Sequence, residues 1–369
     1  MSDAKQPPRD DFSAADDVVA GVLREEQDED DIAPPTRWQK ILAQMVTSRE
    51  LVTFAVVIIL FLFFTAGNPR FVSVNILIGI ARRITPIGIL SIGMTFLLIA
   101  GELDLSVGAS FGFGSVLIGR LASEHHWDPW LSMAIVIAAG LLIGVFNGTV
   151  VTRLGVPSFI ATLGMLAALR GAGNALAGGV QTYAKNTDQL FYQFFNGNFP
   201  DTRLPNMFVV MLILTLIAAV ILATTKFASD VYATGGNAEA ARNNGIATRR
   251  VKMICFVLVG GLAGLAGAIQ FGYIQYVPSN AGVGFELQVI AAAIIGGVGL
   301  FGGRGTILGS LLGAVILAEL TSGLVMIGAR DYWDGVAAGV VIVVAVALDG
   351  LLRRGAARTL ARASSAQRG

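Results

Sequence analysis

The stretch MFVVMLILTLIAAVILATT, residues 207–225, runs for nineteen positions without a charged side chain. A helix needs about 20 mainly apolar residues to cross the hydrocarbon core of a bilayer, so this stretch has the length and composition of a membrane span. A polar loop follows it, and the chain becomes apolar again over residues 251–272. This alternation predicts membrane helices joined by polar connections.

The composition of the whole chain agrees with a membrane protein. Hydrophobic residues make up 54% of the 369 positions and charged residues 14%, whereas about 25% charged residues is usual in soluble proteins. The mean hydropathy is +0.69. The 45 glycines suit membrane helices, because small residues let helix backbones approach closely. Rows of small residues at four-residue spacing predict such close packing, and they are Gly140, Gly144 and Gly148, then Gly260, Gly264, Ala268 and Gly272, then Gly305, Gly309 and Gly313. We therefore expect an all-α polytopic membrane protein.

Ten segments have roughly the length and composition of membrane spans. They are residues 50–67, 84–100, 105–122, 131–151, 156–177, 207–225, 251–272, 286–301, 306–327 and 334–352. Three of them, 84–100, 105–122 and 286–301, are short, which leaves a re-entrant helix as an alternative to a crossing. Residues 71–83 are expected to approach the second span along the membrane surface. Residues 37–352 then form one transmembrane domain.

The placement of lysine and arginine predicts the orientation. With ten spans and the N-terminus inside, the inner connections carry fifteen of these residues from position 37 onward, and the outer connections carry eight. Positive residues accumulate on the cytoplasmic side, so both termini are expected there. The loop 226–252 is then cytoplasmic, and the largest external loop is 178–206.

The external loop is rich in aromatic residues, among them Tyr183, Phe191, Phe194 and Phe199. Aromatic residues amid Asn, Asp and Gln can bind a sugar or a docking protein. They also anchor loops among lipid headgroups, and the sequence slightly favours this second use.

The two ends of the chain differ from the apolar region. Residues 1–36 contain eleven Asp and Glu but only three Lys and Arg, and they show no durable apolar period. This pattern predicts a disordered acidic cytoplasmic tail, without the basic and apolar regions of a secretory signal. Residues 353–369 are basic and are expected to form a cytoplasmic C-terminal tail.

The polar loop contains a short helix signal, TGGNAEAARNNGI, at residues 234–246. Asn237 is a suitable N-cap, Glu239 stands at the positive end of the helix, and Gly245 can end the helix. Roughly two turns lie between the cap and the end, too few for stability in water alone. We therefore expect another protein to hold this helix.

Three carboxylates lie in or next to apolar segments, where charge is costly. Glu102 and Asp104 interrupt the apolar sequence between the second and third spans. They either line a break in a helix at membrane depth, or lie solvated in a tight cytoplasmic loop. Glu319 lies inside a span, which favours a pore-lining or hydrogen-bonding role over a position at the membrane boundary.

Four uncharged polar residues also occur in or near the apolar segments: Asn147, Asn174, Gln270 and Gln288. Such groups suit a neutral polyhydroxylated solute. Hydrogen bonding between helices is nevertheless their commoner use.

The sequence contains no signature of catalysis. A single cysteine, Cys255, excludes a disulfide framework, and the adjacent His125 and His126 lie in a short polar link that is better explained as a surface loop than as a metal site. There is no phosphate-binding loop that ends in Lys-Ser/Thr, and no set of nucleophile, base and acid. We expect a chain that is not an enzyme and binds no metal or cofactor itself.

Five ordered motifs together resemble the inner-membrane permeases of bacterial ABC importers for ribose, xylose, arabinose and related sugars. They are GMTFLLIAGELDLSVG (93–108), VPSFIATLG (156–164), GGNAEAA (235–241), FELQVIAAAIIGG (285–297) and GGRGT (302–306). The resemblance covers about residues 50–352, and the second and third motifs are most similar to the xylose branch. The long acidic tail departs from the short leader of that family.

The resemblance implies that residues 226–252 form a coupling loop, whose short helix sits in a cleft of a partner ATPase. The alanines of that helix would give a smooth packing face between polar edges. The residues expected to couple to the ATPase are Gly235, Gly236, Asn237, Glu239, Ala240, Ala241, Arg242 and Gly245. The residues expected along the translocation path are Glu102, Asp104, Asn147, Phe159, Asn174, Gln288 and Glu319.

The resemblance also implies partners and a mechanism. It predicts a second permease subunit, most simply an identical one, and two pseudo-symmetric halves in each subunit. Cytoplasmic ATPases would bind ATP and Mg, and an extracytoplasmic binding protein would deliver a pentose, a related sugar or a polyol for transport by alternating access. The expected location is the bacterial inner membrane, in contact with lipid and not with nucleic acid.

Rival interpretations start from the carboxylates and the loop. A self-sufficient ion-coupled secondary transporter or channel would use Glu102, Asp104 and Glu319 as coupling groups. A membrane-embedded enzyme is disfavoured by the missing catalytic sets. A scaffold that recruits a partner without transport is a further alternative.

Overall fold

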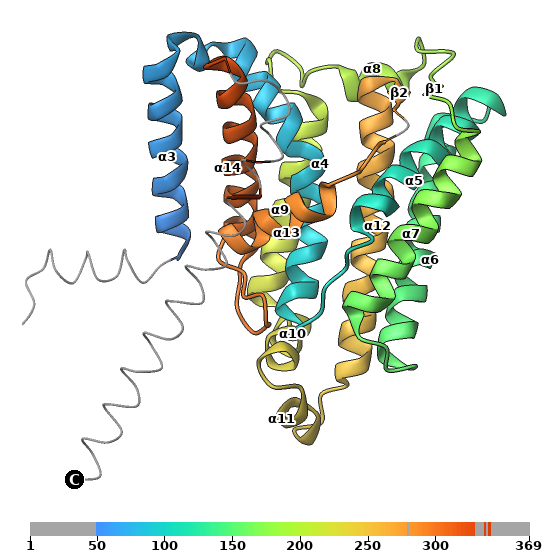
Figure 1. Ribbon diagram of the computed structural model, residues 1–369, viewed down its shortest axis with the longest axis vertical. Coiled ribbons are helices and arrows are strands. Elements are labelled where there is room, and N and C mark those ends of the chain that lie inside the picture. Colours follow the sequence, from blue (N-terminus) through green and yellow to red (C-terminus); the bar gives the residue numbers. More distant parts are fainter. Residues whose placement is uncertain (1–48, 279, 329–335, 337–338, 341–369) are drawn as a thin grey trace, which may run out of the picture. The chain divides into compact units, whose positions relative to one another are not determined.

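The computed structural model describes residues 49–278, 280–328, 336 and 339–340. In this part of the chain nearly all regular structure is helical (Figure 1), which confirms the predicted all-α class. Seven of the described helices are long and apolar enough to cross a membrane. They are α3 (Arg49–Gly67), α4 (Val74–Ile99), α6 (Pro129–Thr152), α7 (Ser158–Ala177), α9 (Asn206–Thr224), α12 (Thr248–Ile274) and α14 (Ile307–Met326).

Shorter elements connect these helices. They are η1 (Pro69–Val72), α5 (Val107–Gly119), the π-helical turn η2 (Arg120–Glu124), β1 (Thr182–Tyr183), α8 (Leu190–Asn196), α10 (Lys226–Gly236), α11 (Ala238–Asn243), β2 (Tyr276–Val277) and α13 (Phe285–Ile295). The predicted tails, 1–36 and 353–369, lie outside the described residues. So does nearly all of the predicted span 334–352.

Seven of the ten predicted spans correspond to these long helices. The predicted spans 105–122 and 286–301 correspond to the short helices α5 and α13, which are not among the seven that are long enough to cross a membrane. In the second span, the helix begins earlier than expected. Residues 74–83, expected at the membrane surface, are the first turns of α4, which continues without interruption to Ile99. Arg82 and Arg83 therefore lie inside a long helix. The structure thus joins most of the predicted approach segment to the second span in one helix.

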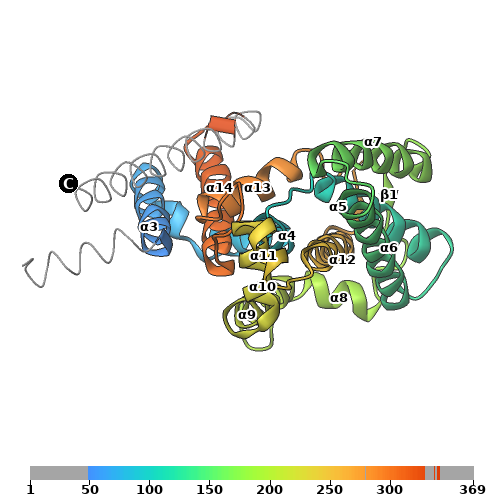
Figure 2. The ribbon, with the colours of Figure 1, turned by 90° about the horizontal axis from the view of Figure 1, so that it is seen from below.

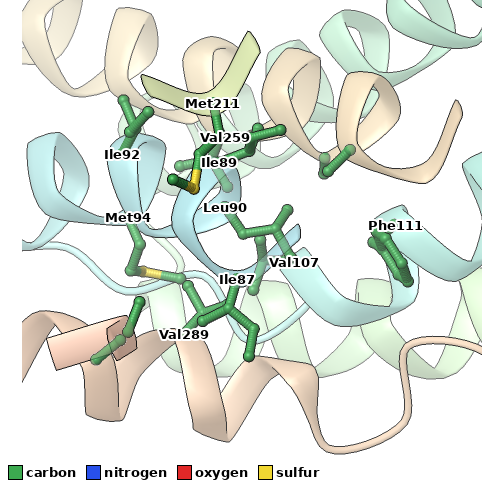
Figure 3. Packing of buried hydrophobic residues seen from close by; sticks show 14 of the residues in the cluster. Ile87, Ile89, Leu90, Ile92, Met94, Val107, Phe111, Met211, Val259 and Val289 are labelled. Carbon is green, nitrogen blue, oxygen red and sulfur yellow. The ribbon is translucent and has the colours of Figure 1, made fainter. Parts of the chain in front are cut away.

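The core of the described part is built around α4 and α12. Seen from the α11 end, these two helices lie between α3 and α14 on one side and α5, α6 and α7 on the other (Figure 2). The last sixteen residues of α4 are all buried. Among them, Leu90 lies beside Val107 of α5, and Ile89 lies beside Val259 of α12 (Figure 3).

Glycine rows allow the closest helix contacts, as predicted from their four-residue spacing. Gly140 on α6 lies against Gly260 on α12, so closely that a side chain on either residue would overlap with the other's backbone carbonyl. Gly309 on α14 approaches Gly296 after α13 in the same way. Small residues are needed here because the two backbones are in direct contact.

Two short helices begin where the chain is not helical. Each of α5 and α13 follows a long central helix, α4 or α12, after an irregular segment. The starts of α5 and α13 meet: Gly108 packs against Gly282, and the rings of Phe111 and Phe285 stack with centroids 4.9 Å apart. The same pattern of long helix, break and short helix thus occurs in both parts of the chain.

The loop 178–206, which the sequence predicts to be external, is held by its aromatic residues and by a two-stranded pairing. Phe191, Tyr192 and Phe195 of α8 are buried, and the Phe191 ring lies 5.2 Å from that of Trp130. Strand β1 pairs antiparallel with β2, which fixes the segment that leads to α13. These three α8 side chains therefore belong to the protein core. From sequence, only ligand binding and anchoring among lipid headgroups were expected of the aromatic residues of this loop.

The contact between α6 and α12 leads to a stability prediction. Gly260→Val should lower the melting temperature of the purified protein in detergent, because overpacking of a tight contact costs about 1–3 kcal/mol or more. Gly164→Val is the matched control, because a Cβ at Gly164 on α7 would meet nothing within 4 Å. Equal melting temperatures for the two variants would contradict the packing described above.

Candidate coupling loop and solute path

The helix predicted in the polar loop is present as α11. The Asn237 side chain accepts hydrogen bonds from the backbone N–H groups of Glu239 and Ala240, each at 3.0 Å. Gly245 follows the helix with a φ of +81°, a conformation that glycine adopts without strain. The cap and the exit expected from sequence are therefore confirmed.

The two consecutive alanines of α11, Ala240 and Ala241, do not share a face. Ala240 is exposed, as are Glu239 and Arg242 on either side of it. Ala241 is only 5% exposed, and its carbonyl oxygen accepts a hydrogen bond from Ile246 N at 3.0 Å. Only Ala240 thus offers its methyl group to another protein, whereas Ala241 holds the loop together.

The two glycines before α11 also have different surroundings. A Cβ on Gly235 would overlap with the carbonyl oxygen of Ile99, at the end of α4, while a Cβ on Gly236 would meet nothing within 4 Å. Gly303 N, in the loop between α13 and α14, donates a hydrogen bond to the same Ile99 oxygen at 2.9 Å. Gly235 therefore faces into the protein.

We call this meeting point the glycine junction: Gly101, Gly235, Gly236, Gly302 and Gly303. It joins three segments far apart in sequence through backbone contacts. A further bond reinforces it, because Tyr232 Oη on α10 donates to the carbonyl oxygen of Gly305 at 2.6 Å. Burial raises the pKa of the Tyr232 phenol, with Glu50 as a second cause, so the phenol stays protonated as a donor.

The break between α4 and α5 is sealed by side chains of α7. Ser158 Oγ accepts from Leu103 N at 3.4 Å, and Thr162 Oγ1 accepts from Leu105 N at 3.0 Å. Ser158 and Thr162 are one turn apart and lie on one face of the helix. Their motif, 156–164, thus supplies the hydrogen bonds that the irregular backbone requires.

The carboxylates of this break are enclosed by protein. Asp104 is 2% exposed and accepts hydrogen bonds from Ser106 N at 2.7 Å, Ser106 Oγ at 2.6 Å and Asn147 Nδ2 at 3.3 Å. Glu102 pairs with Lys252 Nζ at 2.5 Å. Asp104 is therefore buried in a break and not solvated, and Asn147, from α6, is its partner.

The other residues expected along the path lie apart. Gln288 borders a cavity among α4, α12, α13 and α14, and Asn174 borders a smaller one beside α5 and α7. Phe159 is 54% exposed on α7. Glu319 is 5% exposed within α14. The seven residues thus do not form a single site.

The sequence interpretation missed two features. Arg170 on α7 pairs with Glu286, in the first turn of α13, at 2.8 Å. Arg82 borders the same cavity as Gln288. Both arginines are among the eight positive residues that were assigned from sequence to the outer side. The signal that identifies Arg82 is its position eight residues into a 26-residue apolar helix.

Comparison with known proteins gives the family. Residues 76–346 match the family described as "Branched-chain amino acid transport system / permease component". The chain belongs to this permease family. With seven apolar helices among its described residues, it is a multi-pass inner-membrane permease.

Relatives support the same conclusion. The autoinducer 2 import system permease protein LsrC of Salmonella typhi is 33% identical over 317 residues, which cover 85% of this chain and 89% of the relative. The proteins of the same name from Klebsiella pneumoniae and Escherichia coli are 33% and 32% identical to this chain. The matched regions cover 85% of this chain in both cases, and 90% and 91% of the two relatives. No solved structure matches this chain. The resemblance to importer permeases is confirmed.

The glycine junction leads to a second stability prediction. Gly235→Ala should destabilise the permease by about 1–3 kcal/mol, because its methyl group has no space against Ile99. Gly236→Ala should leave the melting temperature unchanged or slightly higher, since alanine favours the helix and its methyl group meets nothing. Thermal unfolding of the two purified variants is the measurement. A larger loss in Gly236→Ala would contradict the assignment of Gly235 to the interior.

Proposed function

We propose that this chain is the membrane-spanning subunit of an ATP-driven importer, and that α11 docks on a cytoplasmic ATPase. The observation that carries the proposal is the exposed, capped helix α11, only six residues long, attached to the core by the glycine junction. So short a helix is unstable alone. A partner surface that receives Ala240, Glu239 and Arg242 explains why the chain displays it.

The contacts behind α11 supply a mechanical route. Gly235 touches the end of α4 and the loop that follows α13 through backbone atoms. Closely packed backbone transmits displacement without much compression. A movement of α11 driven by ATP binding therefore reaches the break before α5 and the far end of α13. Rocking of two such subunits would then open the path alternately to each side.

The solute in this proposal is a monosaccharide or a related polyol. The motifs that resemble sugar importers support it, as do relatives named for the import of autoinducer 2. Pentoses such as ribose and xylose are the first compounds to test, together with autoinducer 2. An extracytoplasmic binding protein and a second permease subunit complete the proposed assembly.

Ala240→Glu tests the docking of α11. Uptake of radiolabelled D-ribose, D-xylose or autoinducer 2, whichever the wild-type cells import, should be abolished in cells whose only copy is this variant. The bulky carboxylate would remove the fit to the ATPase and leave the membrane level of the permease unchanged. The ATPase that co-purifies with the wild-type chain should be lost from the variant.

Leu154→Glu is the control for this experiment. It adds the same carboxylate to the α6–α7 connection, at a side chain 71% exposed and away from α11, and uptake should persist. Wild-type uptake by Ala240→Glu would refute the docking assignment. Uptake driven by an ion gradient into vesicles that contain only this chain would instead establish the secondary transporter.

A further inference from the structure

A cavity of about 350 Å³ lies among α4, α12, α13 and α14. Its polar lining consists of Arg82, Arg83, Gln270, Tyr273, Gln288 and Thr321. Cavities that bind small molecules commonly measure roughly 300–1,000 Å³ and combine apolar walls with a few polar groups. Pro86, Ile87, Phe285 and Leu317 supply the apolar walls here, so this cavity has the size and lining of a site for a small solute.

The cavity is distant from α11 but connected to it. Gln270 on α12 comes 22 residues after the start of that helix at Thr248, which places it roughly 33 Å farther along the helix axis. Gln288 and Phe285 belong to the first turn of α13, and the loop after α13 enters the glycine junction. A solute in the cavity therefore contacts a helix whose far end is joined to the coupling loop.

Two polar atoms in the cavity wall lack a partner within the described part of the chain. They are Arg82 Nε, a donor, and Gln270 Oε1, an acceptor. Arg82 is otherwise engaged with Tyr273, through a 3.4 Å hydrogen bond from Nη1 to Oη and a guanidinium carbon 5.0 Å from the ring centroid. Buried polar atoms without partners are unfavourable.

A hydroxyl group can satisfy both kinds of atom, because it accepts one hydrogen bond and donates another. A carboxylate or phosphate would satisfy Arg82 but would present no donor to the oxygen of Gln270. Both protein atoms are covered in this conformation, so a solute reaches them after rotation of the side chains. The cavity thus matches hydroxyl groups better than an anion.

The charge of the lining discriminates further. Two arginines border the cavity, and no Asp or Glu is among the lining residues within the described part of the chain. The ammonium group of an amino acid would find no carboxylate here and would lie near like charge. The nearby Glu286 is directed to Arg170 on another helix. This chemistry disfavours an amino acid, although amino-acid transport gives the family its description.

We propose that this cavity is a binding station for a small, neutral, polyhydroxylated solute, and that Gln270, Gln288 and Arg82 select it over an amino acid. The inference rests on the proposed function and names the site and solute class within it. The aliphatic and aromatic walls take the C–H face of the solute, and the polar side chains take its hydroxyl groups.

Thiol labelling of the purified, full-length protein tests the station. The native Cys255 is fully buried, so it gives a low background. Thr321→Cys places a reactive thiol in the cavity, and Val325→Cys, at an exposed position one turn farther along α14, is the control. The rate of reaction with a water-soluble maleimide is measured with D-ribose, D-xylose or L-leucine present.

D-ribose or D-xylose should slow the labelling of Thr321→Cys about threefold at a concentration of about twice its Kd, as mass action requires. L-leucine should have no effect, and labelling of Val325→Cys should not respond to any of the three. Adding Gln270→Leu to Thr321→Cys should raise the sugar concentration for half-protection about fivefold, the usual effect of one lost hydrogen bond.

Several results would contradict the proposal that this cavity binds a neutral polyhydroxylated solute. They are protection by L-leucine and not by sugar, equal slowing at both cysteines, no protection at all, or a Thr321→Cys thiol that never reacts. If Thr321→Cys does not fold, Gly79→Cys on α4 gives the same readout, because Gly79 also borders the cavity and a Cβ there would meet nothing within 4 Å. The assay needs neither ATPase nor binding protein, so a failure of ATP-driven uptake would leave protection intact, and a failure of protection would leave ATP-driven uptake intact.

Discussion

Hydrocarbon offers no hydrogen-bond partner to a peptide group, and this constraint governs the two helix breaks on which the rest of the structure depends. An irregular backbone segment inside a membrane domain must be sealed by protein. Ser158 and Thr162 accept from the N–H groups of Leu103 and Leu105 in the first break. In the second, tight turns such as Phe285 N to Gly282 O close the segment on itself.

Sealing explains why polar residues of the apolar segments have so little contact with solvent. Asp104 and Asn147 hold the first break closed through Ser106, so they act in structure and are not free to coordinate an ion. Lys252 and Glu102 join that break to the start of α12. Two of the three carboxylates named by the secondary-transporter interpretation therefore already have partners within the protein.

The same breaks place the functional parts. Each allows a short helix, α5 or α13, to begin inside the bundle, and the two beginnings meet at Phe111 and Phe285. The far end of α13 leads to the glycine junction, which touches α10 beside the coupling loop. One short helix therefore has the proposed solute cavity at its start and the proposed coupling loop near its end, and the two proposals are thereby joined in one element.

The sequence by itself determined the features whose signals lie within a few residues of one another. Apolar length predicted the spans, the Asn237 cap and Gly245 exit predicted α11, and four-residue glycine spacing predicted the close helix contacts. Tertiary structure alone decided which neighbours meet: Gly235 and not Gly236 at the junction, Asn147 beside Asp104, and Arg82 beside Tyr273 and a cavity. Such contacts join residues far apart in the sequence, and Arg82 and Tyr273 are 191 positions apart. No local pattern records such a distance, because only the packing of the helices brings the partners together.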